Sequence, residues 1–398
     1  MRKMLSVLFT VTAGAWFILT SGAQQVGNKD RTPIILDRPP VRIVEDPYPV
    51  FNGITMDPEK KQLIVADDNR SSVLTYNSQF RPTTGITEPI RQISGPKTRL
   101  GFVCGVAISP ENNELYAVSG EHEYASVFPL EANGDIAPLR RFVIDHGAAD
   151  IFLDSRHDEL FITDEHINKV AVFRRTADGN EKNLRFIQGP KTGLADPQRI
   201  YVDTTNDEVF VTNHGSWRLT ESGEPYVSVV VGNKNASLAL RPSTGKFLPP
   251  SITVFSRTAQ GDATPLRTIQ GPKTGLNVPL GVVLDAETGQ LAVANSGNSS
   301  ILIFDRTANG DTAPLRVIKG PATGLAGPSG LYFDAKRGEL WVGNWDNHTA
   351  TSYGRTAQGD AKPLRIMRSA PKAKRFAGFG NIGDVGFDPL RQEILVPN

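Results

Sequence analysis

Histidines are the residues of this chain best suited to acid–base chemistry near neutral pH. Four of them directly follow apolar, strand-like runs: His122, His166, His214 and His348. Asp164 and Glu165 stand just before His166, so a histidine there could act as a general base beside a carboxylate. The recurrence of histidine at one kind of position predicts a shared catalytic or ligand-binding face.

A long sequence repeat positions these histidines. An apolar residue followed by arginine opens a strand-like run seven times: Val41-Arg42, Ile90-Arg91, Leu139-Arg140, Leu184-Arg185, Leu266-Arg267, Leu315-Arg316 and Leu364-Arg365. Proline precedes six of these pairs, and most successive copies lie 45 to 49 residues apart. A repeat of that length made of short β runs is typical of propeller blades.

The two clearest repeats show what one blade contains. Gly281–Asp285 matches Gly330–Asp334 as a first strand, and Leu291–Asn295 matches Leu340–Asn344 as a second. A third run and the apolar-Arg run follow, which predicts four antiparallel strands per blade. Tight turns before the fourth strand are predicted from four triplets whose glycine can adopt positive φ: Asn133–Asp135, Gln260–Asp262, Asn309–Asp311 and Gln358–Asp360.

First-strand motifs also number seven, beginning near Gly53, Gly105, Asp150, Arg199, Gly281, Gly330 and Asp384. The chain is therefore predicted to be all-β, a single seven-bladed β-propeller over residues 34–398. Residues 34–44 precede any first strand, and residues 384–396 have no third or fourth strand after them. We expect the N-terminal strands to complete the C-terminal blade and close the ring.

The N-terminus resembles a secretory signal. Arg2 and Lys3 precede an apolar run over residues 5–19, and Ser21-Gly22-Ala23 suits cleavage. We expect a signal peptide over residues 1–23, a linker over 24–33, and export to the periplasm or the extracellular space without stable membrane insertion. A single-pass anchor is the alternative. The one cysteine, Cys104, is interpreted as a buried strand residue, with a reactive thiol as the alternative.

The charge balance argues against nucleic acid as a partner. The formal net charge is +1, with acidic and basic residues spread through all repeats and no basic stripe. The sequence also has no zinc-protease, Walker A or serine-hydrolase motif. We expect a monomer that binds a protein or a small-molecule ligand.

Loops in a propeller emerge on two faces, and this sorts the histidines. The second-to-third-strand loops and the connections between blades share one face, which we call the histidine face. Five of the six histidines are predicted there, and His157 lies in a first-to-second-strand turn on the opposite face, the turn face. An insertion at about residues 214–250, carrying His214 and Trp217, is predicted to be a lid or binding loop on the histidine face, with a covering loop as the alternative.

The starts of the first strands face the central channel and differ between repeats. They are Asn52, Cys104, Asp150, Arg199, Ser329 and Asp384. This ring could coordinate a cation or hold a carboxylate through Arg199. Alternatively, Arg199 pairs with Asp150 or Asp384 and closes the channel.

Acidic and amide residues end most second strands: Asp67, Asp164, Asn213, Asn295, Asn344 and Asn398. Short side chains of this type commonly bond nearby backbone N–H groups, so we interpret them as structural and assign no metal ligand. No cofactor is assigned from the sequence, although the central ring could hold a divalent cation.

The second-strand motifs Val65-Ala66-Asp67, Val211-Thr212-Asn213 and Val293-Ala294-Asn295 resemble those of YVTN and NHL repeat β-propeller proteins. The resemblance spans about residues 49–398 and implies a propeller within a superfamily that includes binding proteins, lactonase-like hydrolases and a lyase. The gluconolactonase-like members hold a metal through an acidic residue near the first strand. Val50-Phe51-Asn52-Gly53 has none, and this departs from their pattern.

We therefore expect an exported binding protein that recognises its ligand or partner through the histidine face. The predicted ligand-binding residues are Asn52, Asp150, Arg199, His214, Trp217, Trp345 and Asp384. The alternative is a lactonase-like hydrolase or lyase, with or without a divalent cation. Its catalytic candidates are His166, His214, His348, Asp164 and Glu165.

Overall fold

Six four-stranded antiparallel sheets make up most of the described chain and form the blades of a β-propeller. The computed structural model describes residues 46–79, 85–215, 248–375, 386–388 and 393–395. The expected blade architecture is confirmed: in each blade the strands pair in sequence order, from the innermost to the outermost. The helical segments in the described ranges are single short turns, and none of them is long and apolar enough to cross a membrane.

The first three blades contain β1 to β12. Blade 1 comprises β1 (Ile54–Asp57), β2 (Gln62–Asp67), β3 (Ser72–Asn77) and β4 (Arg91–Ile93). Blade 2 comprises β5 (Val103–Ser109), β6 (Glu114–Ser119), β7 (Tyr124–Pro129) and β8 (Arg140–Val143), with η1 (Pro110–Asn112) after β5. Blade 3 comprises β9 (Ala148–Asp154), β10 (Glu159–Asp164), β11 (Lys169–Arg174) and β12 (Arg185–Ile187).

The other three blades contain β13 to β24. Blade 4 comprises β13 (Pro197–Asp203), β14 (Glu208–Asn213), β15 (Ser251–Ser256) and β16 (Arg267–Gln270). Blade 5 comprises β17 (Pro279–Asp285), β18 (Gln290–Asn295), β19 (Ser300–Asp305) and β20 (Arg316–Ile318), with η2 (Pro272–Thr274) before it and η3 (Ser296–Asn298) within it. Blade 6 comprises β21 (Pro328–Asp334), β22 (Glu339–Asn344), β23 (Thr349–Gly354) and β24 (Arg365–Arg368), with η4 (Trp345–Asn347) after β22.

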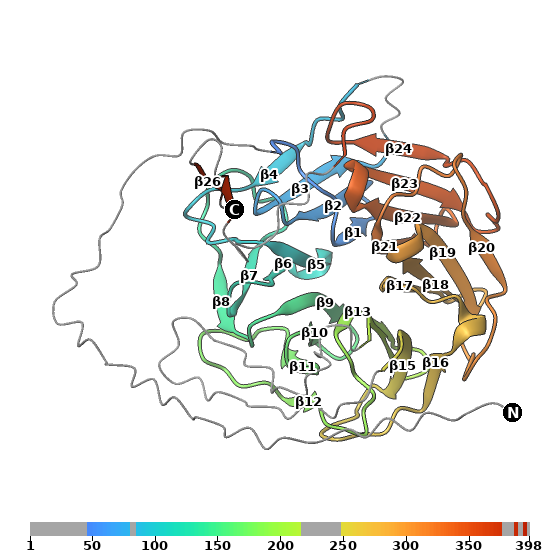
Figure 1. Cartoon of the computed structure of the whole chain (residues 1–398). Helices are drawn as coiled ribbons and strands as arrows, with labels where there is room; N and C mark the ends of the chain where they lie inside the picture. Colours follow the sequence, from blue (N-terminus) through green and yellow to red (C-terminus); the bar gives the residue numbers. More distant parts are fainter. Residues whose placement is uncertain (1–45, 80–84, 216–247, 376–385, 389–392, 396–398) are drawn as a thin grey trace, which may run out of the picture. The chain divides into compact units, whose positions relative to one another are not determined.

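The innermost strands lie around a common axis at the centre of the propeller (Figure 1). Strands β1, β5, β9, β13, β17 and β21 contact one another in that cyclic order, and β21 contacts β1 in turn. The sequence favours this arrangement because inner strands are apolar on both sides, as in the fully buried β17, whereas an outer strand such as β16 buries one residue in four. Strands covered on both faces suit the inside of a stack of blades.

The hydrophobic core lies between the blades rather than within any one of them. Six clusters of buried apolar side chains are present, and each joins two neighbouring blades. Phe51 and Tyr76 of the first blade, for example, pack in one cluster with Trp341 and Met367 of the sixth. Six interfaces close a ring of six blades.

The predicted count of seven blades is therefore wrong. A Cβ atom on Gly330 of β21 would lie 2.3 Å from the carbonyl oxygen of Asn52, so only glycine permits blade 6 to approach blade 1 this closely. The Ser329 hydroxyl donates to the carbonyl oxygens of Phe51 (3.1 Å) and Asn52 (2.8 Å). Direct contact between the first and sixth blades leaves no place between them for a seventh.

The described C-terminal strands do not complete a ring blade in the way expected. Strands β25 (Gly386–Asp388) and β26 (Glu393–Leu395) form the predicted C-terminal hairpin, but they make a two-stranded sheet of their own. Residues 34–44, predicted to pair with it, lie outside the described residues. Blade 1 obtains its fourth strand from β4, so the six blades are complete without either end of the chain.

The glycine turns predicted before the fourth strands also form backbone hydrogen bonds with the neighbouring blade. Gly310 of blade 5 has φ of +68°, donates its N–H to Thr268 O in the outer strand of blade 4 (2.7 Å) and accepts from Gln270 N (3.1 Å). Equivalent parallel bridges join Ile93 to Gly134, Phe142 to Gly179, Ile187 to Gly261 and Ile318 to Gly359. At the closure, Thr87 N–H donates to Arg368 O (2.7 Å). These hydrogen bonds cover outer-strand edges that would otherwise be open.

The repeated outer-strand arginines hold neighbouring blades together on the turn face. Arg267 of blade 4 binds Glu208 at the start of β14 (2.8 Å), and Arg306 of blade 5 binds the same carboxylate (2.7 Å). Glu114 and Glu159 are each held by two arginines in the same way. These arginines therefore act as structural residues whose side chains are paired.

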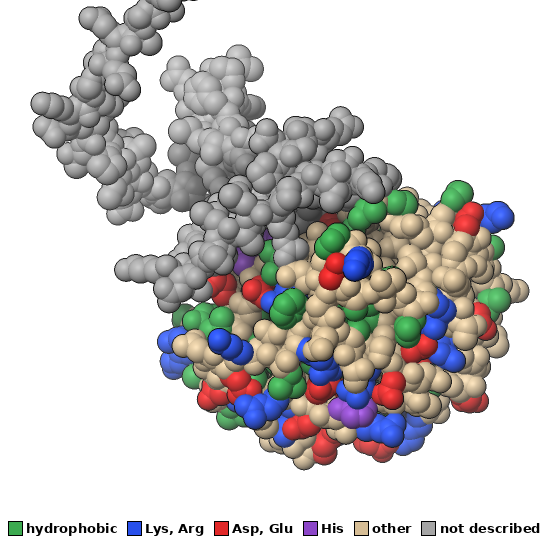
Figure 2. Space-filling model, turned by 90° about the horizontal axis from the view of Figure 1, so that it is seen from below, with side chains coloured by type: hydrophobic (Ala, Val, Ile, Leu, Met, Phe, Trp, Pro, Cys, Tyr) green, Lys and Arg blue, Asp and Glu red, His purple; other side chains and the backbone are tan. Residues whose placement is uncertain are grey.

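The outer surface offers separate apolar side chains rather than one apolar patch. One large apolar residue precedes each outer strand and is about half exposed: Ile90, Leu139, Leu184, Leu266, Leu315 and Leu364. On the face drawn in Figure 2, hydrophobic side chains lie in small groups among charged and other atoms. Scattered single residues of this kind are ordinary on protein surfaces and need no functional explanation.

Candidate functional site: the central funnel

Arg199 crosses the central channel and links four blades. It lies near the start of β13 in blade 4, and its Nη1 donates to the carbonyl oxygens of Cys104 in blade 2 (2.7 Å) and Ala149 in blade 3 (2.6 Å). Nη1 also lies 3.3 Å from Asp150 Oδ1, and Nη2 donates to Asn52 Oδ1 in blade 1. Of the two predicted roles for Arg199, the structure shows the one in which it pairs with Asp150.

Asn52 connects this arginine to a second buried acid. The Asn52 amide donates to Asp68 Oδ2 (2.9 Å), while its Oδ1 accepts from Arg199. Burial of Asp68 and the neighbouring Asp67 raise the pKa of Asp68 to about 7, against the lowering effect of Asn52 and Arg199. The hydrogen-bonded chain from Arg199 to Asp68 fixes the orientation of the Asn52 side chain.

The ring of first-strand starts differs from the prediction at one position. Asn52, Cys104 and Ser329 each stand directly before a glycine that packs against the next inner strand, and in blade 5 the residue at that place is Leu280, directly before Gly281. The predicted sixth member, Asp384, lies outside the described residues. Leu280 is a member of the ring because β17 is one of the six inner strands. Six blades close the ring, so no inner strand from residues 384–388 is required.

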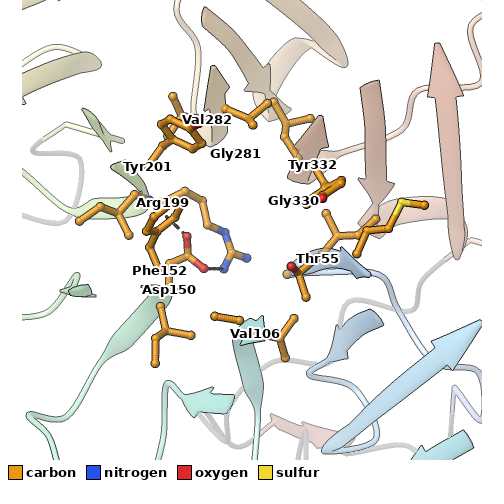
Figure 3. A pocket seen from close by; sticks show the side chains of 18 of the residues that line it. Thr55, Val106, Asp150, Phe152, Arg199, Tyr201, Gly281, Val282, Gly330 and Tyr332 are labelled. Carbon is orange, nitrogen blue, oxygen red and sulfur yellow. Dashed lines mark hydrogen bonds and ion pairs between the residues drawn. The ribbon is translucent and has the colours of Figure 1, made fainter. Parts of the chain in front are cut away.

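A cavity of about 390 Å³ lies on the channel axis, lined by the inner strands of all six blades (Figure 3). Asp150 and Arg199 form its inner end. Its walls expose polar as well as apolar surface and include Thr55, Val106, Phe152, Val283, Tyr201, Tyr332 and Phe333. Pro110, in the turn after β5, also lines it, so the cavity extends toward the turn face. We call this cavity the funnel.

The funnel has the properties of a small-molecule site. Its volume falls in the range of ligand pockets, and its lining combines apolar and aromatic side chains with a few converging polar groups. Phe152 and Tyr201 meet edge to face at 5.2 Å between ring centroids. Burial raises the pKa of the Asp150 carboxyl, and Arg199 opposes that effect.

On the histidine face, polar residues of blades 3 and 4 form a continuous network. His166 Nε2 lies 3.2 Å from Glu165 Oε1, and the Gln198 amide donates to both Glu165 Oε2 (2.7 Å) and Asp196 Oδ1 (2.8 Å). His214 Nδ1 lies 3.6 Å from Asp196 Oδ2. Thus His166, Glu165 and His214 of the predicted set are brought together through two residues, Gln198 and Asp196, that sequence reasoning missed.

His146 extends this network. Its ring centroid lies 5.1 Å from that of His166. Partial burial and the neighbouring His166 lower the pKa of His146. The sequence signal that could have revealed the network is the recurrence of acidic and amide residues at both the inter-blade connections and the second-strand ends.

His348 is held in the ring closure and is not placed as a general base. Its side chain is fully buried, with Nδ1 2.9 Å from Pro49 O and Nε2 3.2 Å from Asp46 Oδ2. The neighbouring Ser369 hydroxyl donates to the same Pro49 carbonyl (2.5 Å). His348 therefore anchors the segment before blade 1 onto blade 6.

The residues that end the second strands anchor inter-blade connections, in line with their structural interpretation. Oδ1 of Asn213, Asn295 and Asn344 accepts the backbone N–H of Ala195, Asn277 and Ala326, respectively. Asp67 Oδ1 accepts from Val50 N (2.9 Å). Within the described ranges, no group of three or more His, Cys, Asp or Glu side chains is arranged to hold a metal ion.

Of the acidic residues in this set, Asp164 has the pKa that is raised most. Its Oδ1 accepts from His166 N (3.0 Å) and Ile167 N (3.1 Å), and the side chain is buried. Burial, with the neighbouring Asp145, raises the pKa of Asp164 to about 8. At neutral pH the carboxyl is largely protonated, which does not suit the predicted role of charged partner to a histidine.

Replacing Asp164 by asparagine should remove a pH dependence of stability. Between about pH 4 and pH 8 the folded wild-type protein holds a proton that the unfolded chain has lost, so its stability falls as pH rises. We expect a difference in slope of up to about 1.4 kcal/mol per pH unit between wild type and Asp164→Asn. Urea unfolding across this range measures it, and parallel curves would refute the assignment.

None of the other predicted site residues that the structure describes lies in the funnel lining. Trp345 begins η4 on the histidine face and donates its backbone N–H to Gly327 O (3.0 Å). Trp217 and most of the 214–250 insertion lie outside the described residues, between β14 and β15. Cys104 is buried in β5, and burial raises the pKa of its thiol, which agrees with the structural interpretation.

Comparisons with known proteins establish the fold and nothing finer. No family model matches the chain, and no curated protein matches it. A solved structure titled hydrazine synthase, from Kuenenia stuttgartiensis, is similar to it with a TM-score of 0.53 and 12% sequence identity. The match covers 89% of this chain and 97% of that chain. At this identity the likeness supports the propeller architecture, and the YVTN/NHL resemblance stays a prediction.

Proposed function

We propose that this protein is a binding propeller whose ligand is a small molecule held in the central funnel. The observation that carries the proposal is the cavity of about 390 Å³ enclosed by six inner strands, with Arg199 and Asp150 at its inner end. A rigid ring of strands holds the walls in place, so little conformational entropy is lost on binding.

The composition of the walls supports this site over the rest of the described surface. Thr55, Phe152, Tyr201 and Tyr332 are partly exposed apolar or amphipathic residues in otherwise buried strands. Burying their exposed area against a ligand contributes about 25 cal/mol per Å² of apolar surface. The scattered leucines of the outer rim provide no comparable concave surface.

Filling the funnel should abolish binding. With tryptophol, a neutral aromatic alcohol, as the probe, we expect calorimetric titration of the wild type to give a Kd on the order of 0.1 mM. Thr55→Trp places an indole in the cavity and should weaken binding at least about tenfold. Thr258→Trp, the same change at an exposed turn residue outside the funnel lining, serves as the control.

The outcomes separate funnel binding from binding elsewhere. Loss in Thr55→Trp with retention in Thr258→Trp supports the funnel, provided that both variants keep the circular dichroism of the wild type. Equal binding by all three proteins would place the probe on another surface. Absence of binding to the wild type by tryptophol and by its charged analogues would reject the proposal.

The network of His166, Glu165, Gln198, Asp196 and His214 supports the predicted histidine face as a second, polar interaction surface. The hydrolase or lyase alternative would use His166 beside Glu165, the closest histidine–carboxylate pair in this network. A screen of ester and lactone hydrolysis with wild type and His166→Gln tests it. Turnover that is lost in the variant would favour the enzyme.

The N-terminal sequence supports export as part of the proposal. Mass spectrometry of the protein made by a secreting host should find a mature chain that begins near Gln24. A retained N-terminal segment would contradict cleavage.

A further inference from the structure

We infer that the funnel selects organic cations: an aromatic or alicyclic body lies between the inner strands, and an ammonium group binds Asp150. The inference rests on the funnel binding proposed above and names the chemical class of the ligand. It follows from the hydrogen bonds that Arg199 and Asp150 already make at the inner end, and from the charges near the funnel walls.

The two terminal nitrogens of Arg199 are already used by the protein, and its remaining N–H group, on Nε, is buried. Its two terminal nitrogens donate to Cys104 O, Ala149 O, Asn52 Oδ1 and Asp150 Oδ1. Binding of a ligand carboxylate would require some of these bonds, which link four blades, to break. The structure therefore disfavours the predicted capture of a carboxylate by Arg199.

Asp150 keeps capacity for a ligand. Its side chain is 16% exposed, against 6% for Arg199, and it lines the funnel. Oδ2 accepts from Ile200 N at 3.2 Å, and Oδ1 is 3.3 Å from Arg199 Nη1. A carboxylate has about four lone-pair sites, so acceptor positions remain for an N–H donor. A charge-assisted bond to an ammonium is the strongest contact available to it.

The aromatic walls also favour a positively charged ligand. Phe152, Tyr201 and Tyr332 line the cavity, and aromatic faces attract cations within about 6 Å of the ring centroid. The ring of Phe333, a fourth lining residue, already faces the guanidinium of Arg355, 5.4 Å from the ring centroid. Among the described lining residues, Arg199 is the one basic group. Figure 3 shows its guanidinium near the centre of the lining, beside Asp150.

Carboxylates at the ends of the inner strands add negative potential. Asp57 and Asp203 end β1 and β13, both are buried, and their carboxylates accept bonds from local turn groups. Among the described residues, neither carboxylate is paired with a cationic side chain, whereas Asp285 and Asp334, which end β17 and β21, are paired with Arg355 and Arg337. Burial is the main cause that raises the pKa of Tyr201 to about 12, and Asp203 and Asp285 contribute to it.

Three probes of one shape but different charge test the inference. Tryptamine carries an ammonium, tryptophol a hydroxyl, and indoleacetate a carboxylate on the same indole body. By calorimetry with the full-length wild type near neutral pH, we expect tryptamine to bind about tenfold tighter than tryptophol. Indoleacetate should bind at least about thirtyfold more weakly than tryptamine.

Two variants locate the effect. Asp150→Asn should reduce the advantage of tryptamine over tryptophol to about twofold or less, because the acceptor charge is gone. Tyr332→Leu removes one aromatic face without touching Asp150 and should reduce the same advantage about threefold. If Asp150→Asn does not fold, the wild-type probe series and Tyr332→Leu still decide the question.

Failure of the inference differs from failure of the proposed function. If the three probes bind the wild type equally and Thr55→Trp blocks all of them, the funnel binds ligands but does not select cations. If indoleacetate binds most tightly, the inference is overturned. If none of the three binds the wild type, both proposals fail.

Discussion

Arg199→Met lowers the free energy of unfolding by about 3–5 kcal/mol. The reason is that Asp150 is left without its cationic partner, and the carbonyl groups of Cys104 and Ala149 lose their donor in the centre of the ring. Urea unfolding monitored by circular dichroism measures the change.

The double variant Arg199→Met/Asp150→Asn provides the control. Removing both charges leaves no uncompensated ion, so we expect it to recover at least about half of the loss. A loss below about 1 kcal/mol in the single variant, or strictly additive effects of the two substitutions, would mean that Arg199 does not hold the channel together.

His348→Ala should destabilise the protein by about 2–3 kcal/mol through the closure of the ring. The substitution leaves a cavity at a fully buried position and removes the contacts with Pro49 O and Asp46. The loss should be accompanied by faster amide exchange at Thr87 and Ser369. The N–H of Thr87 in blade 1 donates to Arg368 O in blade 6, and the N–H of Ser369 donates to His348 O.

His157→Ala is the matched control for this prediction. His157 also contacts an aspartate, with Nδ1 2.7 Å from Asp154 Oδ2, but its side chain is 29% exposed and lies in the turn between β9 and β10. We expect a loss of no more than about 1 kcal/mol. Similar losses for both variants, with unchanged exchange at Thr87, would argue against a closing role for His348.

Much of each blade was predictable because its strands and turns repeat in the sequence. Matching runs such as Gly281–Asp285 and Gly330–Asp334 identify inner strands, since a repeated apolar pattern in one chain reflects a repeated environment. Turn glycines such as Gly310 were predicted for the same reason, and their positive φ angles confirm it.

The number of blades was not predictable from motif counting. Residues 40–42 and 384–388 carry the same motif as true blade strands, yet closure depends on whether blade 6 can contact blade 1. That contact depends on Gly330 beside Asn52 and on His348 beside Pro49, which are pairings between residues almost 300 positions apart. A local motif contains no information about such a pairing.

The funnel was only partly predictable. Asn52, Asp150 and Arg199 were found because they break the repeat at the channel-facing position. Thr55, Phe152, Tyr201 and Tyr332 were missed because aromatic and β-branched residues in a strand ordinarily indicate core packing. Only the ring geometry shows that these four line a shared cavity.

The most direct test of ligand binding in the funnel is a crystal structure of the protein with tryptamine. We predict density for the indole between Phe152, Tyr201 and Tyr332, with the ammonium within hydrogen-bonding distance of an Asp150 carboxylate oxygen. Tryptamine bound at the histidine face, with only solvent in the funnel, would contradict the account.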